Sequence, residues 1–207
     1  MSLKRTVAPA DLPLTLDEIK DHIRWESDAA DDAVLALYRR SAVAQMDGAE
    51  GLLNRAIITQ TWELKLDGFP VASFPTSTGL RKSQIHIPLP PLQSITSVQY
   101  IDTDGTTQTL AASKYKVLNA SNPTRAALIE EAFGETWPAT RHESGSVTVT
   151  FVAGYGLRNA VPEHIRHLLL FTIGDAYDGR APISAKPLMR SPSYQGLFRQ
   201  ARYEAVA

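Results

Sequence analysis

The chain has 207 residues, of which 43% are hydrophobic and 21% charged, and its formal net charge is −1. This composition is typical of a folded globular protein, and the near-zero charge gives no general attraction to DNA, RNA or an anionic membrane. Because there is no cysteine and no apolar run near the roughly 20 residues of a membrane span, we expect a soluble, cytoplasmic protein without disulfides or thiolate metal sites.

Two helices are predicted in the N-terminal quarter of the chain. Thr15 and Glu18 have the spacing of a capping box, which predicts a short helix from about residue 16 to 24. A longer helix should follow and end near Leu53, because apolar residues recur there at helical spacing. Its start is marked by a cluster of acidic residues favoured by the helix dipole: Asp28, Asp31 and Asp32.

The middle of the chain alternates apolar and polar residues, which is the pattern of half-buried strands. We predict seven strands, at about residues 56–66, 84–87, 94–101, 106–110, 114–118, 126–131 and 146–153. Asp104-Gly105 is a hairpin signal. Residues 68–83 are rich in Gly, Pro and hydroxyl side chains and predict a long loop whose role the sequence leaves open.

Three prolines interrupt this region in the stretch IPLPPLQSI, residues 87–95. Proline fixes its own backbone angle and cannot donate to a sheet ladder, so the stretch predicts a rigid kink between two strands. Leu89 and Leu92 should anchor the kink to the core. We interpret it as structural and not as a proline-rich binding motif.

The last third of the chain predicts one helix and then a tail. Pro162 and Glu163 suit a helix start and Gly179 a stop, and the apolar face between them should pack on the sheet. Beyond residue 180, a stretch rich in proline and serine is followed by a short, basic amphipathic segment. We therefore predict an α+β fold: an N-terminal helical pair, a mostly antiparallel β-sheet, a C-terminal helix packed on the sheet and an extended C-terminal tail. The domain is expected over residues 1–180 and the flexible tail over 181–207.

No motif for catalysis, cofactor binding or metal binding emerges from the pattern. His164 and His167 could share a helix face, but a third ligand is not signalled. The acidic cluster at residues 28–32 lacks the spacing of a calcium loop, and Asp102 with Asp104 suits a turn better than an acid/base pair. Arg39-Arg40 and Arg81-Lys82 could touch phosphate, but without interleaved aromatic residues they are better explained by solvated faces or by ion pairs with neighbouring subunits. We expect no enzyme activity and no cofactor.

Three stretches, in this order, resemble the head-tail connector proteins (adaptor or head-completion proteins) of long-tailed bacteriophages and gene transfer agents. They are IPLPPLQSITSVQYIDTDG, WPATRHESGSVTVTFVAGYG and VPEHIRHLLLFTIGDAYDGR, and the likeness extends over about residues 12–180. The resemblance implies a virion structural protein that forms a ring of about twelve copies below the portal and joins head to tail around the DNA channel. It also implies assembly in the host bacterial cytoplasm, followed by a place at the head-tail junction of the particle.

The partners implied by the resemblance are other copies of the chain, the portal protein and the next tail or stopper component. DNA would pass through the lumen without specific binding, and no membrane is involved. Members of this family use the C-terminal segment to grip the portal, so the candidate docking residues lie in the tail: Tyr194, Leu197, Phe198, Arg199, Ala201 and Arg202. Two alternatives stay open, a DNA-binding or DNA-packaging accessory protein that uses the basic tail and Arg39-Arg40, and an enzyme with an unrecognised site.

Overall fold

The computed structural model describes residues 1–23, 32–71, 83–178 and 191–204. The chain divides into two compact units, each built from segments that are distant in sequence. The strand unit consists mainly of residues 1–8 and 59–154, and the helical unit of residues 9–58 and 155–206. The α+β class predicted from the sequence is confirmed, since these described segments contain four α-helices and two antiparallel sheets.

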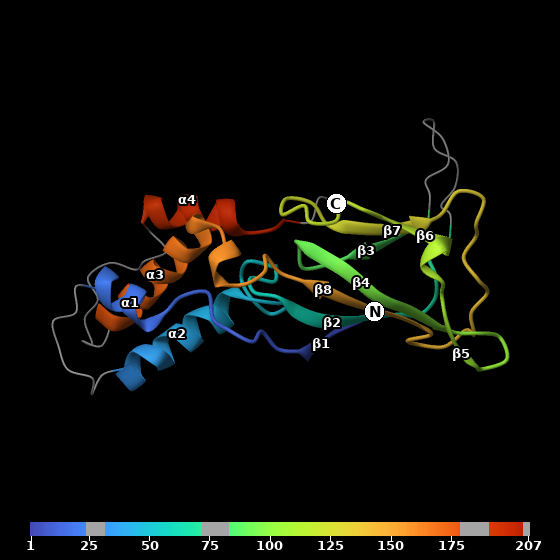
Figure 1. Cartoon of the computed structure of the whole chain (residues 1–207), viewed down its shortest axis with the longest axis horizontal. Coiled ribbons are helices and arrows are strands. Elements are labelled where there is room, and N and C mark those ends of the chain that lie inside the picture. Colours follow the sequence, from blue (N-terminus) through green and yellow to red (C-terminus); the bar gives the residue numbers. More distant parts are fainter. Residues whose placement is uncertain (24–31, 72–82, 179–190, 205–207) are drawn as a thin grey trace. The chain divides into compact units, whose positions relative to one another are not determined.

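The strand unit contains a five-stranded and a three-stranded sheet, both antiparallel (Figure 1). The five-stranded sheet has the order β1-β2-β8-β4-β5 and the three-stranded sheet the order β3-β7-β6. The strands are β1 (Ser2–Val7), β2 (Gln60–Leu66), β3 (Gln84–Ile87), β4 (Leu92–Ile101), β5 (Thr107–Thr109), β6 (Tyr115–Leu118), β7 (Ala127–Glu131) and β8 (Val147–Ala153).

Burial follows the alternation of the sequence. In the central strand β8, four apolar residues are buried and the threonines between them are partly exposed. β2 pairs with β8 in continuous register from Gln60 opposite Ala153 to Leu66 opposite Val147. All seven predicted strands are confirmed within a few residues. β1 was not predicted, because as an edge strand it buries too little to show an alternating pattern.

The proline stretch joins the two sheets. β3 belongs to the three-stranded sheet and β4 to the five-stranded sheet, so the chain changes sheet across Pro88, Pro90 and Pro91. Leu89 and Leu92 are both buried, which confirms their predicted anchoring role. The carbonyl of Pro91 accepts a hydrogen bond from the Gly154 amide (N–O 2.9 Å), and this contact fixes the start of β4 beside the end of β8.

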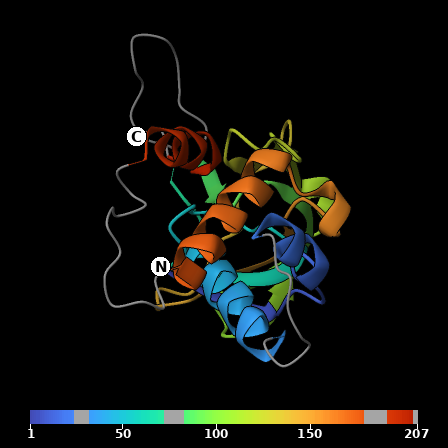
Figure 2. The ribbon, with the colours of Figure 1, turned by 90° about the vertical axis from the view of Figure 1, so that its left-hand side faces the viewer.

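The helical unit has α3 at its centre, with α1, α2 and α4 packed against it (Figure 2). The helices are α1 (Leu16–His22), α2 (Asp32–Met46), α3 (Glu163–Asp178) and α4 (Pro192–Ala201). The capping box at α1 is present as predicted: the Thr15 hydroxyl accepts from the Glu18 amide (3.1 Å), and the Glu18 carboxylate accepts from the Thr15 amide (2.7 Å).

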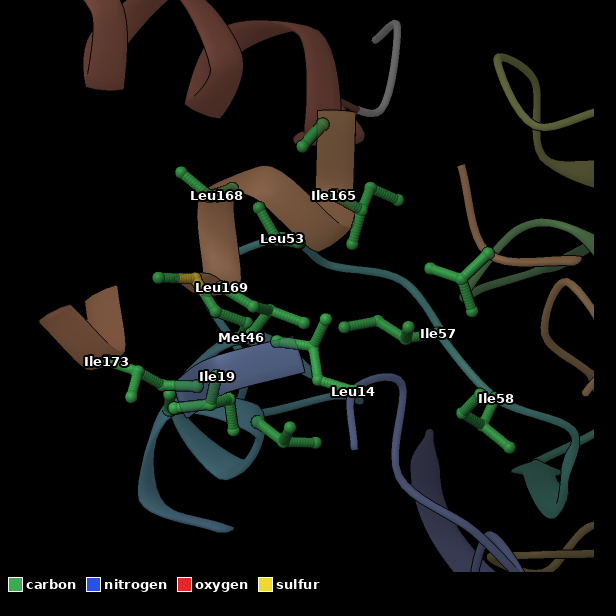
Figure 3. Packing of buried hydrophobic residues seen from close by; sticks show 14 of the residues in the cluster. Leu14, Ile19, Met46, Leu53, Ile57, Ile58, Ile165, Leu168, Leu169 and Ile173 are labelled. Carbon is green, nitrogen blue, oxygen red and sulfur yellow. The ribbon is translucent and has the colours of Figure 1, made fainter. Parts of the chain in front are cut away.

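Apolar side chains from α1, α2, α3 and the segment after α2 form one buried cluster (Figure 3). The labelled members are Leu14, Ile19, Met46, Leu53, Ile57, Ile58, Ile165, Leu168, Leu169 and Ile173. The sequence predicts the sheet as the partner of the apolar face of α3. In the structure that face is buried inside the helical unit, because the other helices supply the complementary apolar side chains.

The predicted end of α2 is wrong by seven residues, since the helix ends at Met46 and not at Leu53. Gly48 has a left-handed backbone (φ 83°), and its amide donates to the Arg55 carbonyl (2.8 Å). The Asp47 carboxylate accepts a hydrogen bond from the Ile57 amide (2.7 Å). These contacts turn the chain back toward the core, where Leu53 is still buried although it lies outside the helix.

Candidate functional site

The segment proposed for portal docking forms α4, which packs on α3 inside the helical unit. The sequence places this segment in a detached flexible tail, and the structure differs from that expectation over residues 191–204. The physical reason is the strong amphipathicity of α4, whose apolar side finds a binding surface on its own unit. The linker residues 181–190 lie outside the described residues.

The six candidate residues divide by burial into three pairs. Tyr194 and Ala201 are buried, with exposed fractions of 3% and 0%. Leu197 and Phe198 are partly buried against the same cluster. Arg199 and Arg202 are exposed. Only the last two pairs therefore present surface to a partner while α4 stays in place.

Aromatic contacts connect the buried side of α4 with its accessible side. The rings of Tyr194 and Phe198 are stacked, with centroids 6.3 Å apart and planes 14° from parallel. The Arg202 guanidinium lies over the Phe198 ring, 6.0 Å from its centroid. A guanidinium above an aromatic face retains donors for a carboxylate, so this pair combines apolar area with a positive charge.

The backbone after α4 is tied to the turn that follows α2. The Tyr203 amide donates to the Leu53 carbonyl (2.9 Å), and the Asn54 side-chain amide donates to the Tyr203 carbonyl (3.5 Å). At the other end, Pro192 occupies the first turn and Ser191 caps the helix without a side-chain hydrogen bond. The backbone that follows the C-terminal end of α4 is thus fixed to the helical unit.

The histidine pair on α3 lies at the edge of a surface hollow. His164 and His167 border a surface hollow between α1 and α3 together with His22. Burial and then the charge of Arg55 lower the pKa of His164, whereas burial and then His167 lower the pKa of His22. His167 stacks on Phe171 with ring centroids 4.6 Å apart. Within the described residues there is no group of three or more metal-ligating side chains.

Three of the other candidate charges, Asp102, Asp32 and Arg39, have structural roles. Asp102 accepts hydrogen bonds from the amides of Asp104 (3.1 Å) and Thr106 (2.8 Å), as a turn residue does. Asp32 begins α2 and pairs with Lys20 (2.6 Å). Arg39 donates to the Leu14 carbonyl (3.2 Å), whereas Arg40 is exposed. Asp28, Asp31, Arg81 and Lys82 lie outside the described residues.

A buried cation was missed by the sequence reasoning. Arg55 is 4% exposed, donates to the Tyr155 hydroxyl and lies over the ring of the same tyrosine, 5.9 Å from its centroid. Burial lowers the pKa of the guanidinium and raises the pKa of the phenol. The two residues are 100 positions apart, and neither has a motif around it that could have shown the pairing.

Neither the known protein families nor the curated proteins contain a match to this sequence. Solved structures do share its fold. One, described as the neck of an empty gene transfer agent (GTA) particle computed with C6 symmetry, has a TM-score of 0.75 at 22% identity. A second, from the virion of a native GTA particle, has a TM-score of 0.73 at 23% identity. A third, from the neck of a native GTA particle computed with C12 symmetry, has a TM-score of 0.68 at 19% identity. Each match covers 100% of this chain and 98% of the other.

None of the helices in the described segments combines the length and the apolar character needed to cross a membrane.

Proposed function

We propose that this chain is a structural subunit of the neck of a gene transfer agent or phage particle, where it acts as the head-tail connector. The observation that supports this most strongly is the match over the whole chain, since both units and their order along the sequence correspond to those of a neck protein. A match confined to one unit would support only a shared domain. The connector is a structural component and not an enzyme.

In this proposal the subunits form a ring of about twelve copies below the portal, around the DNA channel. Two of the similar structures come from necks computed with C6 and C12 symmetry, which agrees with a ring. The partners are the neighbouring copies, the portal protein and the next tail or stopper component. Assembly takes place in the host cytoplasm, before the subunit reaches the head-tail junction.

Portal docking is assigned to the accessible side of α4. Leu197 and Phe198 supply apolar area and Arg199 and Arg202 supply positive charge, while the buried Tyr194 and Ala201 hold the helix in position. The expected portal surface is therefore apolar with carboxylates at its rim.

The decisive experiment mixes the purified chain with the portal protein of the same particle and examines the product by native mass spectrometry and negative-stain microscopy. A closed ring seated on the portal is the expected result. A chain that stays monomeric and does not bind the portal would refute the proposal.

A DNA-packaging accessory protein is the second candidate, supported by the exposed Arg40, Arg199 and Arg202. Its signature would be tight binding to duplex DNA that weakens steeply with salt. With a formal net charge of −1, we expect only weak binding, as suits a lumen through which DNA slides.

A further inference from the structure

The outer face of α2 is poor in charge. The exposed residues on it include Ala33, Leu37, Arg40 and Ala44, which follow one another at helical spacing. Leu37 is 55% exposed, and Arg40 is the one charged residue of this set. An exposed helix face normally carries several charged side chains, so an apolar strip with a single cation is better suited to contact another protein.

A second surface of the helical unit has the complementary character. The hollow between α1 and α3 has a volume of about 610 Å³, and its lining includes the partly buried Leu170 and the rings of His22, His164 and His167 above the buried Leu14. Three carboxylates in the lining (Glu18, Asp21 and Glu163) outnumber its one guanidinium, Arg166. Glu18 and Glu163 both pair with Arg166. The Glu163 carboxylate lies 3.6 Å from the guanidinium and is 92% exposed, so it is also accessible to a partner. The hollow thus offers the side chain of Leu170 and the faces of histidine rings, with carboxylates at its rim.

We propose that the outer face of α2 of one copy docks into the α1–α3 hollow of the next copy. Leu37 and Arg40 are three residues apart, so they lie on one face about one turn from each other. A single helix can therefore place Leu37 against the partly buried Leu170 while Arg40 reaches the carboxylates at the rim.

A second copy is the occupant that best fits these surfaces. The outer face of α2 and the α1–α3 hollow are different surfaces of the same unit, so each copy offers both at once. Repeated head-to-tail contacts of this kind generate a ring when the rotation closes. This inference rests on the proposed ring, which is supported by the likeness to chains from necks with C6 and C12 symmetry.

The absence of native cysteine allows a direct proximity test in the full chain. We would prepare Arg40→Cys and Glu163→Cys as separate variants, mix them in equal amounts at high concentration and with the portal, and add a short bismaleimide cross-linker. The mixture should give a cross-linked dimer, while each variant alone should stay monomeric on a denaturing gel. Gln108→Cys mixed with Glu163→Cys is the matched control, since Gln108 lies on the exposed edge strand β5.

A charge-reversal pair provides an independent readout. Arg40→Glu and Glu163→Arg should each reduce ring formation on the portal at least tenfold, and the two changes together in one chain should restore it. Rings of the unmodified chain together with no dimer from the mixture would overturn the α2–hollow contact while leaving the connector function intact. A dimer from one variant alone would also overturn it, because that result indicates a two-fold contact. Failure of the unmodified chain to form a ring or bind the portal would instead refute the proposed function.

Discussion

Glu18 joins two interactions that fix the start of α1. Its carboxylate accepts the Thr15 amide in the capping box and also binds Arg166 of α3. Partial burial by itself would raise the pKa of Glu18, but the hydrogen bonds from Thr15 and Arg166 together hold the pKa below its ordinary value of 4.5. The folded state therefore favours the charged form of Glu18. The stability that this charge contributes is present above pH 4.5 and is lost as the pH falls through the lowered pKa.

We predict that Glu18→Gln lowers the free energy of unfolding by about 1 kcal/mol at pH 7, because the amide retains a hydrogen bond but loses the charge, and solvent screens part of the effect. The difference from the unmodified chain should shrink as the pH falls through the lowered pKa of Glu18, which urea unfolding over a series of acidic pH values will measure. Glu163→Gln is the matched control, since that carboxylate contacts the same arginine but is 92% exposed. An equal loss in both variants, or a difference that does not shrink as the pH is lowered, would contradict the assignment.

The contributions of Arg55 and Tyr155 to the free energy of unfolding are expected to be coupled. Within the described residues the Arg55 guanidinium has one hydrogen-bond partner, the Tyr155 hydroxyl, and its Nε atom is buried without one. Tyr155→Phe should lower the free energy of unfolding by about 2 kcal/mol, because it leaves a buried donor unsatisfied. Adding Arg55→Met should recover most of that loss, since both polar groups are then replaced by apolar ones. Chemical unfolding of the two single variants and the double variant measures the coupling, and additive losses would exclude it.

At the scale of elements, the turn after α2 decides where the helix ends. A Cβ atom on Gly51 would lie 2.5 Å from the backbone carbonyl oxygens of Met46 and Asp47, which cannot move without disturbing the last turn of α2. Gly51→Ala should therefore lower the free energy of unfolding by about 2 kcal/mol. Gly68→Ala is the control, because its Cβ would make an ordinary contact 3.7 Å from the Thr140 hydroxyl and should change stability by less than about 0.5 kcal/mol. Thermal unfolding of both variants tests this, and equal stabilities would show that the turn can relax.

The same elements show what sequence patterns can and cannot predict. Alternation and capping are local, so β8 and the Thr15 cap were placed correctly from the sequence. β1 is an edge strand with almost all of its side chains exposed, so its sequence does not alternate between apolar and polar residues. The predicted α2 was too long because the buried Leu53 continues the helical spacing of apolar residues beyond the turn. For α4 the amphipathic pattern was read correctly, but a pattern does not say which surface covers the apolar side.

At the scale of the whole molecule, this last point decides how the candidate site can be studied. The exposed residues Arg199 and Arg202 were identified from the sequence together with the buried Tyr194 and Ala201, because all six candidates share one short segment. Only the three-dimensional packing separates the residues that hold α4 from those that it presents. The Arg55–Tyr155 pair could not be predicted from the sequence for the same reason, since its two members meet only after folding.

Deleting residues 191–207 should damage one unit and spare the other. The truncation removes Tyr194 and Ala201 from the cluster of the helical unit and the hydrogen bond from Tyr203 to Leu53, whereas the sheets of the strand unit keep all their strands. Hydrogen exchange followed by mass spectrometry should therefore show lost protection in α3 and in the turn after α2, with β2, β4 and β8 unchanged. Uniform loss through both units, or none in α3, would contradict the packing of α4.

The truncated chain is consequently a poor reagent for portal docking, because lost binding could follow from a disordered helical unit. Arg199→Glu combined with Arg202→Glu avoids this difficulty, since both side chains are exposed and the buried side of α4 is untouched. This variant should keep the exchange pattern of the unmodified chain and bind the portal at least tenfold more weakly, because reversed charges would face the carboxylates expected there. Arg125→Glu, a reversal of an exposed arginine in the strand unit, is the control and should bind normally. If the double variant binds the portal as well as the unmodified chain, α4 is not the docking element. If the control weakens binding equally, the effect results from the change in net charge and not from α4.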